Sequence, residues 1–282
     1  MPQPRVTIVG AGRMGQGLAL ALLAGGYRVT LASRRVHPVI APLTLHTGSL
    51  ASAAAGSDWV ILAVPDEAIS RVAGELAAGG TVTAGHVVLH LSGLLDRSAL
   101  LPLAPSGAGL GSFHPLQTIA DPVTAAERLA GAFVGIEGDE RALARGELLA
   151  DTLRMTPVRV GSAAKAAYHA GAAMAANYTV ALAGVAERLA REAGIPAAAA
   201  ARIFLPLVRG AVANLELGPA AALTGPVRRG DSRTVEAHLE ALGPHDRVLY
   251  RGLGLEALRL AREAGLDEEA AARVEAVLRD EG

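Results

Sequence analysis

Residues 5–33, RVTIVGAGRMGQGLALALLAGGYRVTLAS, carry the pattern that sets the class of fold. Arg5–Val9 and Tyr27–Ala32 are short β-branched runs, and Gly17–Ala24 is a helical run between them. The glycines after the first run have the spacing Gly-x-Gly-x-x-Gly, which lets a pyrophosphate approach a helix N-terminus. A tight turn without a ligand is the alternative. We expect a dinucleotide to contact the residues of this turn, which are Gly10, Ala11, Gly12, Arg13, Met14 and Gly15.

The residues at the end of the second run distinguish the two nicotinamide cofactors. NAD-binding folds have an acidic residue there for the ribose hydroxyls, whereas this chain has Ser33, Arg34 and Arg35. A serine followed by two guanidinium groups suits a 2′-phosphate. The sequence therefore predicts NADP rather than NAD, and the alternative is that both arginines are solvated surface charges.

Strands and helices continue to alternate up to residue 160. Strands are expected at Asp58–Val64, His86–Leu91, Leu110–His114, Ala132–Glu137 and Thr156–Val160, and helices at Leu50–Gly56, Glu67–Ala78, Ser98–Leu103 and Asp139–Arg154. This alternation predicts an α/β fold with a Rossmann-like, doubly wound sheet. Ligands of such sheets bind at the carboxyl ends of the strands. We therefore expect Val64, Pro65, Ser92 and Gly93 to join the cofactor site, with an ordinary turn as the alternative for the last two.

The β pattern stops after Val160, and the rest of the chain is expected to be helical. Helices are expected at Ser162–Ala193, Ala197–Leu217, Thr234–Leu242, His245–Ala264 and Glu268–Arg279, whereas Leu223–Ser232 has no helical period. The sequence thus predicts two domains. Residues 1–160 are expected to bind NADP, and residues 161–282 to bind substrate and to dimerise.

Composition excludes several classes of function. A formal net charge of −1 gives no electrostatic reason to expect nucleic acid or anionic membrane as a partner. The chain has no cysteine, which excludes disulfides and thiolate metal sites, and no His/Asp/Glu grouping has metal-ligand spacing. We see no signal peptide and no uninterrupted apolar run of about 20 residues, so we expect a cytoplasmic protein.

The expected helix after residue 160 carries Lys165, which is the only lysine in the chain. On a regular helix Lys165, His169 and Asn177 fall within roughly 120° of one another. Lysine can titrate when buried whereas arginine stays charged, so Lys165 is our first choice of proton donor and His169 our second. The alternatives are chance survival of one lysine, a histidine that only packs, and an asparagine that bonds another helix. The small residues of this helix also suggest a homodimer.

Two further places hold candidate residues. His114 ends a strand before a proline, where it either faces the nicotinamide or caps the turn. In the Gly- and Arg-rich segment, Thr224 and Arg229 suit a substrate carboxylate, and Asp231 is expected to fix Arg229 by a bidentate pair. The alternative for that segment is a loop that caps the next helix.

Three blocks of sequence carry a family resemblance: Gly111–Thr118, Tyr168–Tyr178 and Thr224–Asp231. With the glycine turn, they resemble a bacterial family that pairs a Rossmann-like domain with a helical domain of unknown function. That family lies within the superfamily of 6-phosphogluconate dehydrogenase, ketopantoate reductase and pyrroline-5-carboxylate reductase. In the hydroxyacid dehydrogenase relatives a lysine opens the long helix and an asparagine follows four residues later. Lys165 matches the lysine, and His169 stands where the asparagine would be.

The sequence as a whole predicts an NADP-dependent oxidoreductase that acts on CH–OH or CH–NH groups. Hydride transfer to C=O or C=N leaves negative charge on the heteroatom, which a proton donor must neutralise. We expect a small oxo acid or imine as substrate, as the resemblance to ketopantoate reductases implies. The alternatives are a non-catalytic NADP-binding sensor and a dehydrogenase that acts on an amino or hydroxy acid.

Overall fold

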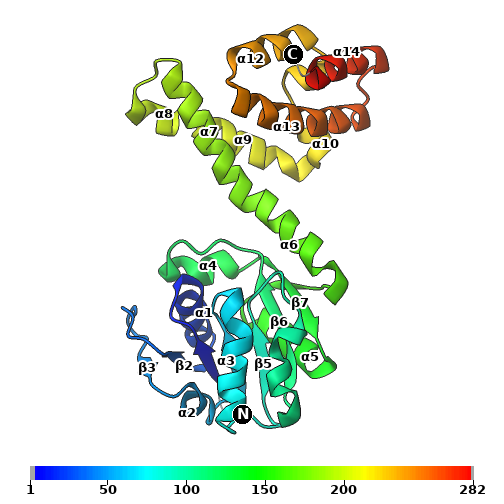
Figure 1. Cartoon of the computed structure of the whole chain (residues 1–282). Helices are drawn as coiled ribbons and strands as arrows, with labels where there is room; N and C mark the ends of the chain where they lie inside the picture. Colours follow the sequence, from blue (N-terminus) through cyan, green and yellow to red (C-terminus); the bar gives the residue numbers. More distant parts are fainter. Residues whose placement is uncertain (1–3, 281–282) are drawn as a thin grey trace. The chain divides into compact units, whose positions relative to one another are not determined.

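The computed structural model of the protein describes residues 4–280 (Figure 1). The chain divides into two compact units, whose boundary in the sequence falls between Val180 and Ala181. The expected boundary after residue 160 marks the end of the last strand, but the first part of the long helix belongs to the sheet unit. The reason is that Lys165, near the start of this helix, is buried and donates hydrogen bonds to residues of the sheet unit.

The first unit is built on a sheet whose order is β3-β2-β1-β4-β5-β6-β7-β8. The strands are β1 Arg5–Val9, β2 Arg28–Ser33, β3 Leu45–Thr47, β4 Trp59–Leu62, β5 Val87–His90, β6 Gly109–Pro115, β7 Phe133–Gly138 and β8 Thr156–Arg159. Strands β1 to β6 are parallel, which confirms the Rossmann-like fold and puts their carboxyl ends on one edge.

Strand β7 departs from the expected parallel arrangement, because it pairs antiparallel with β6. Between them lie only the 3₁₀ turn η2 Pro122–Thr124 and the short helix α4 Ala125–Leu129. A parallel neighbour needs a long crossover, usually a full helix, whereas an antiparallel one does not. Because β8 is parallel to β7, these two strands run opposite to the rest of the sheet.

Helices cover both faces of the sheet. They are α1 Arg13–Ala24, α2 Leu50–Ala54, α3 Asp66–Ala78, the 3₁₀ segment η1 Arg97–Ser106 and α5 Glu140–Thr152. Side chains alternate along each strand, so in β4 Trp59 and Ile61 join the core under α1 and α5, while Val60 and Leu62 join the core under α2, α3 and η1. Strand β3 and helix α4 were not anticipated, because each is too short to show a period.

The long helix is confirmed, with one irregularity. It comprises the 3₁₀ turn η3 Ser162–Ala164, α6 Lys165–Ala173, the π-helical turn η4 Met174–Tyr178 and α7 Thr179–Glu192. A π turn inserts an extra residue into the helix and is frequent at functional sites. It also shifts the angular positions of the residues that follow, so the regular-helix spacing assumed for Asn177 does not hold.

The second unit is helical, as expected. After α7 come α8 Ala197–Ile203, α9 Leu205–Asn214, η5 Leu215–Leu217, α10 Pro219–Ala222, α11 Pro226–Arg229, α12 Ser232–Ala241, α13 Pro244–Glu263 and α14 Glu268–Arg279. Its core is formed by helices α11 to α14, around Val235, Leu258 and Val274. A bidentate ion pair from Arg188 to the largely buried Asp246, at 2.6 and 2.9 Å, joins α7 to α13. Burial and hydrogen bonding of this kind fix the direction of α7 in its unit.

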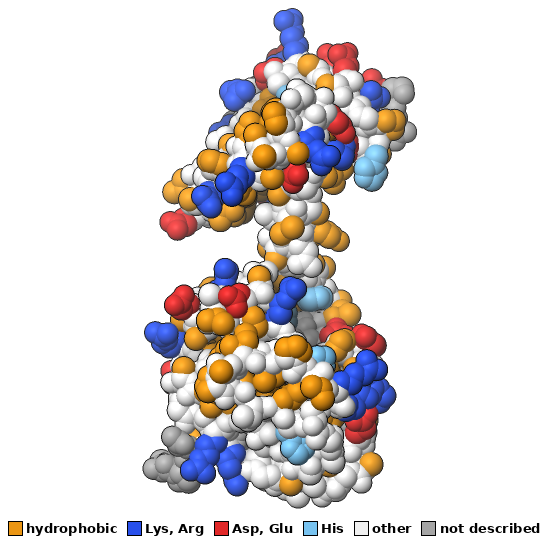
Figure 2. Space-filling view, turned by 90° about the vertical axis from the view of Figure 1, so that its left-hand side faces the viewer, with side chains coloured by type: hydrophobic (Ala, Val, Ile, Leu, Met, Phe, Trp, Pro, Cys, Tyr) orange, Lys and Arg blue, Asp and Glu red, His pale blue; other side chains and the backbone are white. Residues whose placement is uncertain are grey.

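One segment of the second unit is long and apolar overall. By length and composition Ala197–Leu217 is apolar enough to cross a membrane, with a mean hydropathy of 1.3 and only 6% of the window buried. Arg202, Pro206 and Arg209 interrupt it, and one such helix is weak evidence for a membrane protein. It leaves many apolar side chains exposed on the second unit, whose surface is coloured by side-chain type in Figure 2.

Candidate active site

The glycine turn between β1 and α1 is shaped to admit a ligand. A Cβ on Gly10 would overlap the carbonyl of Ala63, and one on Gly15 would overlap the carbonyl of Gly10, so both glycines are required for packing. Gly12 is different, since a Cβ there would meet nothing within 4 Å. Gly12 is the N-cap of α1 and no side chain caps it, which leaves backbone N–H groups and the positive end of the helix dipole facing open space. These residues fit the pyrophosphate of a dinucleotide.

The other residues expected around this turn lie beside it. Ala11 is buried, Met14 is half-buried and Arg13 is exposed. Val64 lies 3.3 Å from the position of a Cβ on Gly10, and Pro65 is the N-cap of α3. The structure therefore brings the expected loops after β1 and β4 together.

The carboxyl end of β2 presents Ser33, Arg34 and Arg35. The backbone N–H of Arg35 donates to Oγ of Ser33 at 3.3 Å. Arg34 donates to Oε1 of Glu75 at 3.3 Å, and Arg71 donates to the same oxygen at 3.0 Å. The structure thus adds Arg71, on α3, to the arginines near this strand end, and sequence spacing gave no sign of it.

Lys165 is the most buried charged side chain of the candidate site, with 2% of its surface exposed. Its Nζ donates to Oγ of Ser112 at 2.7 Å and to the backbone oxygen of Ser92 at 3.2 Å. Burial lowers the pKa of Lys165 below its ordinary value, and nearby carboxylates, Glu137 first, oppose that shift. The lysine therefore lies against β5 and β6, away from bulk water.

The turn after β5 holds Ser92 and Gly93 as expected. Oγ of Ser92 donates to Asp66 at 2.8 Å and accepts from the backbone N–H groups of Leu94 and Leu95, so this hydroxyl orders the turn. A Cβ on Gly93 would overlap Nδ1 of His169 and lie 2.7 Å from Cε1 of His114. The absence of a side chain at Gly93 is what lets two imidazoles close on this turn.

Two histidines and a tyrosine form a cluster above Gly93. His114 and Tyr168 share a hydrogen bond of 2.9 Å between Nδ1 and the phenolic oxygen, and the rings of His114 and His169 meet edge to face at 5.5 Å. Burial, with the charges of His169 and Lys165, lowers the pKa of His114 to about 4. Burial also raises the pKa of Tyr168. Both groups are therefore neutral near pH 7, and Tyr168 is a site candidate that the sequence reasoning did not single out.

Nδ1 of His169 is buried and has no hydrogen-bond partner among the described residues. Buried polar atoms in proteins are almost always paired. Nδ1 of His169 is thus an unpaired polar atom next to Gly93, at the turn after β5.

A cavity of about 730 Å³ adjoins this cluster. It is lined by His114–Thr118 and by the small residues of α6 and η4, with Asn177 among them. Asn177 is exposed and follows Lys165 by twelve residues, which is roughly 18 Å along a helix axis. Lys165, His169, His114, Ser92 and Gly93 therefore come together, and Asn177 lies apart from them on the cavity wall.

The Gly- and Arg-rich segment of the second unit is partly helical, contrary to expectation. Pro226–Arg229 forms α11, after Thr224 and Gly225. Asp231 accepts from the backbone N–H and the hydroxyl of Thr234, at 3.1 and 2.6 Å, and so caps α12. The expected bidentate pair of Asp231 with Arg229 is wrong, because Thr234 offers two donors to the same carboxylate at short range.

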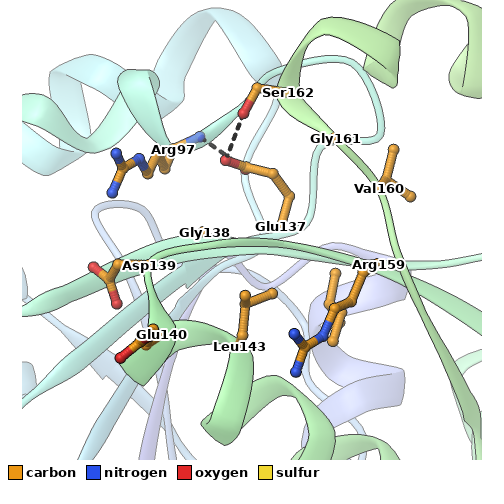
Figure 3. Close-up of a pocket in the computed structure, with 11 residues that line it drawn as sticks. Arg97, Glu137, Gly138, Asp139, Glu140, Leu143, Arg159, Val160, Gly161 and Ser162 are labelled. Carbon is orange, nitrogen blue, oxygen red and sulfur yellow. Dashed lines mark hydrogen bonds between the residues drawn. The ribbon is translucent and has the colours of Figure 1, made fainter.

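Two buried polar groups near Lys165 were missed. His90 is fully buried, accepts from the N–H of Ser92 and bonds the backbone oxygen of Asp96, and burial lowers its pKa to about 4. Glu137 is 6% exposed and accepts from the backbone N–H of Arg97 and from Ser162 (Figure 3). It also accepts from Ser112. A carboxylate inside the otherwise apolar run of β7 was the available signal for Glu137.

No group of three or more His, Cys, Asp or Glu side chains in residues 4–280 has the geometry to hold a metal ion. The candidate site described above consists of the glycine turn, the buried amine of Lys165, the imidazoles of His114 and His169 and the phenol of Tyr168. Among these the amine and the imidazoles are able to move a proton.

Two family models match parts of the chain. Residues 132–272, half of the chain, match the family model described as domain of unknown function (DUF2520). The chain belongs to the DUF2520 family. Residues 5–90 match the model described as NADP oxidoreductase, coenzyme F420-dependent. The Rossmann domain of this DUF2520 protein is thus of the NADP oxidoreductase type, which confirms the expected resemblance.

Solved structures share the fold of this DUF2520 protein. Protein TM1727 from Thermotoga maritima is 23% identical, with a TM-score of 0.68 over 92% of this chain and 98% of that one. Protein BF3122 from Bacteroides fragilis is 21% identical, with a TM-score of 0.69 over 93% and 98% of the two chains. The pyrroline carboxylate reductase of Plasmodium falciparum, solved with NADP bound, is 11% identical, with a TM-score of 0.63 over 98% and 99%. No curated protein matches the chain.

Proposed function

We propose that this DUF2520 protein is an NADP-dependent reductase that converts the C=O or C=N group of a small oxo acid or imine into CH–OH or CH–NH. The observation that carries the proposal is the burial of the only lysine against the turn after β5, at the edge of the sheet where the glycine turn opens. The reduced cofactor, NADPH, would supply the hydride of such a reaction when bound. Everything else must come from the residues of the chain.

Lys165 is the proposed proton donor. An ammonium has three N–H groups, and two of them are used on Ser112 and Ser92. The third remains for the heteroatom of the substrate. The lowered pKa makes the ammonium of Lys165 a stronger acid, so its proton is easier to transfer.

His114 and His169 are proposed to orient the substrate. His114 is held by Tyr168 and stays neutral, so it acts as a hydrogen-bonding group rather than as a cation. His169 offers its unpaired Nδ1. The cavity beside them, with Asn177 in its wall, has the size of a small-molecule site. Thr224 and Arg229 remain predictions for carboxylate recognition by the second unit.

Imines form one arm of the proposed substrate class because of the Plasmodium falciparum relative. The substrate in its name, pyrroline carboxylate, is a cyclic imine with a carboxylate. Oxo acids such as ketopantoate form the other arm, because of the resemblance in the sequence. Both classes put a carboxylate next to an electrophilic carbon, and both need one proton for each hydride.

The test is a panel of 2-oxo acids and cyclic imines with NADPH, for the wild type and for Lys165→Met. We expect the variant to lose turnover by about 100-fold or more, the usual range for a general acid, with an unchanged Kd for NADPH. Lys165→Arg is the matched variant that keeps the charge but holds its proton, and it should be as slow. Unchanged turnover in Lys165→Met would exclude this mechanism. If the wild type binds NADPH but no substrate of the panel leads to NADPH oxidation, the sensor is favoured.

We also propose a homodimer formed through the helical unit. Large apolar side chains are exposed along α8, α9 and η5, among them Leu207 at 69% and Leu217 at 71%. Exposed apolar surface of this extent indicates an interaction site. A second copy of the chain is the partner that the small-residue helix face predicted.

A further inference from the structure

We propose that Glu137 returns a proton from solvent to Lys165, through the hydroxyl of Ser112. This inference rests on the proposed function, since it concerns the proton that Lys165 donates. Glu137 acts through Lys165 and is therefore a positioning residue. The path ends at the cavity shown in Figure 3.

The three side chains form one continuous hydrogen-bonded path. Nζ of Lys165 lies 2.7 Å from Oγ of Ser112, and Oγ of Ser112 lies 3.3 Å from Oε2 of Glu137. Ser112 and Glu137 are directly paired in the antiparallel ladder of β6 and β7. The carboxylate is therefore held beside the hydroxyl by the backbone of the sheet, and the path does not depend on a mobile loop.

The outer end of the path meets solvent at an open cavity of about 570 Å³. Glu137 and Ser162 both line this cavity, and Oε1 of Glu137 accepts from the hydroxyl of Ser162 at 3.1 Å (Figure 3). Ser162 is exposed, whereas Lys165 is 2% exposed. An amine this deeply buried exchanges protons with water slowly unless other groups carry them. Glu137 is the acid that touches both the cavity and the hydroxyl next to the amine.

Other charged and titratable groups surround Lys165, but they are engaged differently. Asp66 from α3, Asp96 at the start of η1, His90 from β5 and His114 from β6 all act on its environment. Asp66 is bonded by the hydroxyl of Ser92, and Asp96 by Ser98. The lysine reaches Ser92 only at its backbone oxygen, which has no proton to pass on. Of the three carboxylates, Glu137 is the one joined to the amine through a shared hydroxyl.

The proton balance of the path is simple. Reduction adds one hydride and one proton to the substrate, and the Lys165 ammonium gives that proton and becomes a neutral amine. The Glu137 carboxylate takes a proton from water in the cavity. The O–H of Ser112 then protonates the amine while the same oxygen takes the proton of Glu137, which becomes a carboxylate again. Each cycle thus consumes one proton from solvent and leaves all three side chains unchanged.

A titration without cofactor or substrate tests the coupling. Because Lys165 is the only lysine, protein labelled with ¹³Cε-lysine gives a single side-chain signal whose pH dependence reports its pKa. Glu137 raises that pKa, so Glu137→Gln should shift the titration to lower pH. Glu140→Gln is the matched control, since Glu140 lines the same cavity and is exposed, and it should leave the signal unchanged. An unshifted titration in Glu137→Gln would overturn the proposal.

Kinetics test the relay itself. In Glu137→Gln and in Ser112→Ala we expect the first turnover of NADPH oxidation to stay within about twofold of the wild type, because Lys165 starts protonated, while steady-state turnover falls about tenfold or more. Acetate should restore turnover in Glu137→Ala, which a structural defect would not allow. If Glu137 variants do not fold, Ser112→Ala decides.

The outcomes separate the relay from the enzyme. Equal losses in the first and later turnovers, or no loss at all, would reject the relay, while turnover that still depends on Lys165 would keep the proposed function. No turnover in the wild type with any substrate would reject both. Loss of turnover in Lys165→Met together with a slow second turnover in Ser112→Ala supports both.

Discussion

Gly93 and His114 approach so closely that a Cβ on Gly93 would stand 2.7 Å from Cε1 of His114. The same Cβ would overlap Nδ1 of His169. The turn after β5 thus fixes where both imidazoles lie, and any side chain there must displace them.

Gly93→Ala should therefore impair the site while leaving the fold intact. We expect turnover to fall about 100-fold, since small displacements of reacting groups cost that much, with a Kd for NADPH within a few-fold of the wild type. Gly74→Ala is the control, because a Cβ there meets nothing within 4 Å. Because Gly74 lies inside helix α3, Gly74→Ala should raise the free energy of unfolding, measured in urea, by about 0.5–1 kcal/mol. Normal turnover in Gly93→Ala would show that the imidazoles do not take part.

Replacing the arginines after β2 should lower the preference for NADPH. A charge-assisted hydrogen bond contributes about 1.5–3 kcal/mol, so Arg34→Ala and Arg35→Ala should each weaken NADPH binding by roughly 10- to 100-fold and leave NADH binding almost unchanged. Fluorescence titration with both cofactors measures this. Arg28→Ala, an exposed arginine at the other end of the same strand, should change neither. A wild type that prefers NADH would contradict the assignment of NADP.

Acid should destabilise the sheet unit through its buried histidines. The pKa of His90 falls from 6.5 to about 4 on folding, so the unfolded chain binds more protons between these values. The contribution of neutral His90 to the free energy of unfolding is therefore fully present above about pH 6.5. It is lost as the pH falls towards 4, by up to about 3 kcal/mol. His114 shifts in the same direction, and His114→Gln should remove part of the loss. Urea unfolding at several pH values measures this loss. Signals of His90 and His114 that titrate near 6.5 in the folded protein would contradict the prediction.

The proposed dimer predicts a particle of twice the chain mass of 28.6 kDa in sedimentation or light scattering. Leu207→Asp should raise the dimer Kd by about tenfold or more, because a charge in an apolar interface is costly to bury. Val36→Asp is the control, since Val36 is 83% exposed but lies in the sheet unit. A monomeric wild type at micromolar concentration would refute the dimer.

Much of the fold was readable from local patterns. The spacing of Gly10–Gly15 and the apolar strand β4 express constraints between residues that are near one another in the sequence, and the turn between β1 and α1 and the strand β4 were both confirmed. The long helix after the sheet was likewise expected from its composition. What local spacing did not show was the π turn at Met174–Tyr178, because helix-forming residues fit either geometry.

The candidate site divides in the same way. Sequence alone singled out Lys165, His169, His114 and Gly93 from their residue types and from their positions on one helix or at the ends of strands. Three features were set by how the strands pair across the sheet. They are the meeting of these residues, the antiparallel direction of β7 and the position of the Glu137 carboxylate beside Ser112. Register is a long-range property: it follows from how whole elements bury their apolar faces against one another, and no stretch of a few residues contains it.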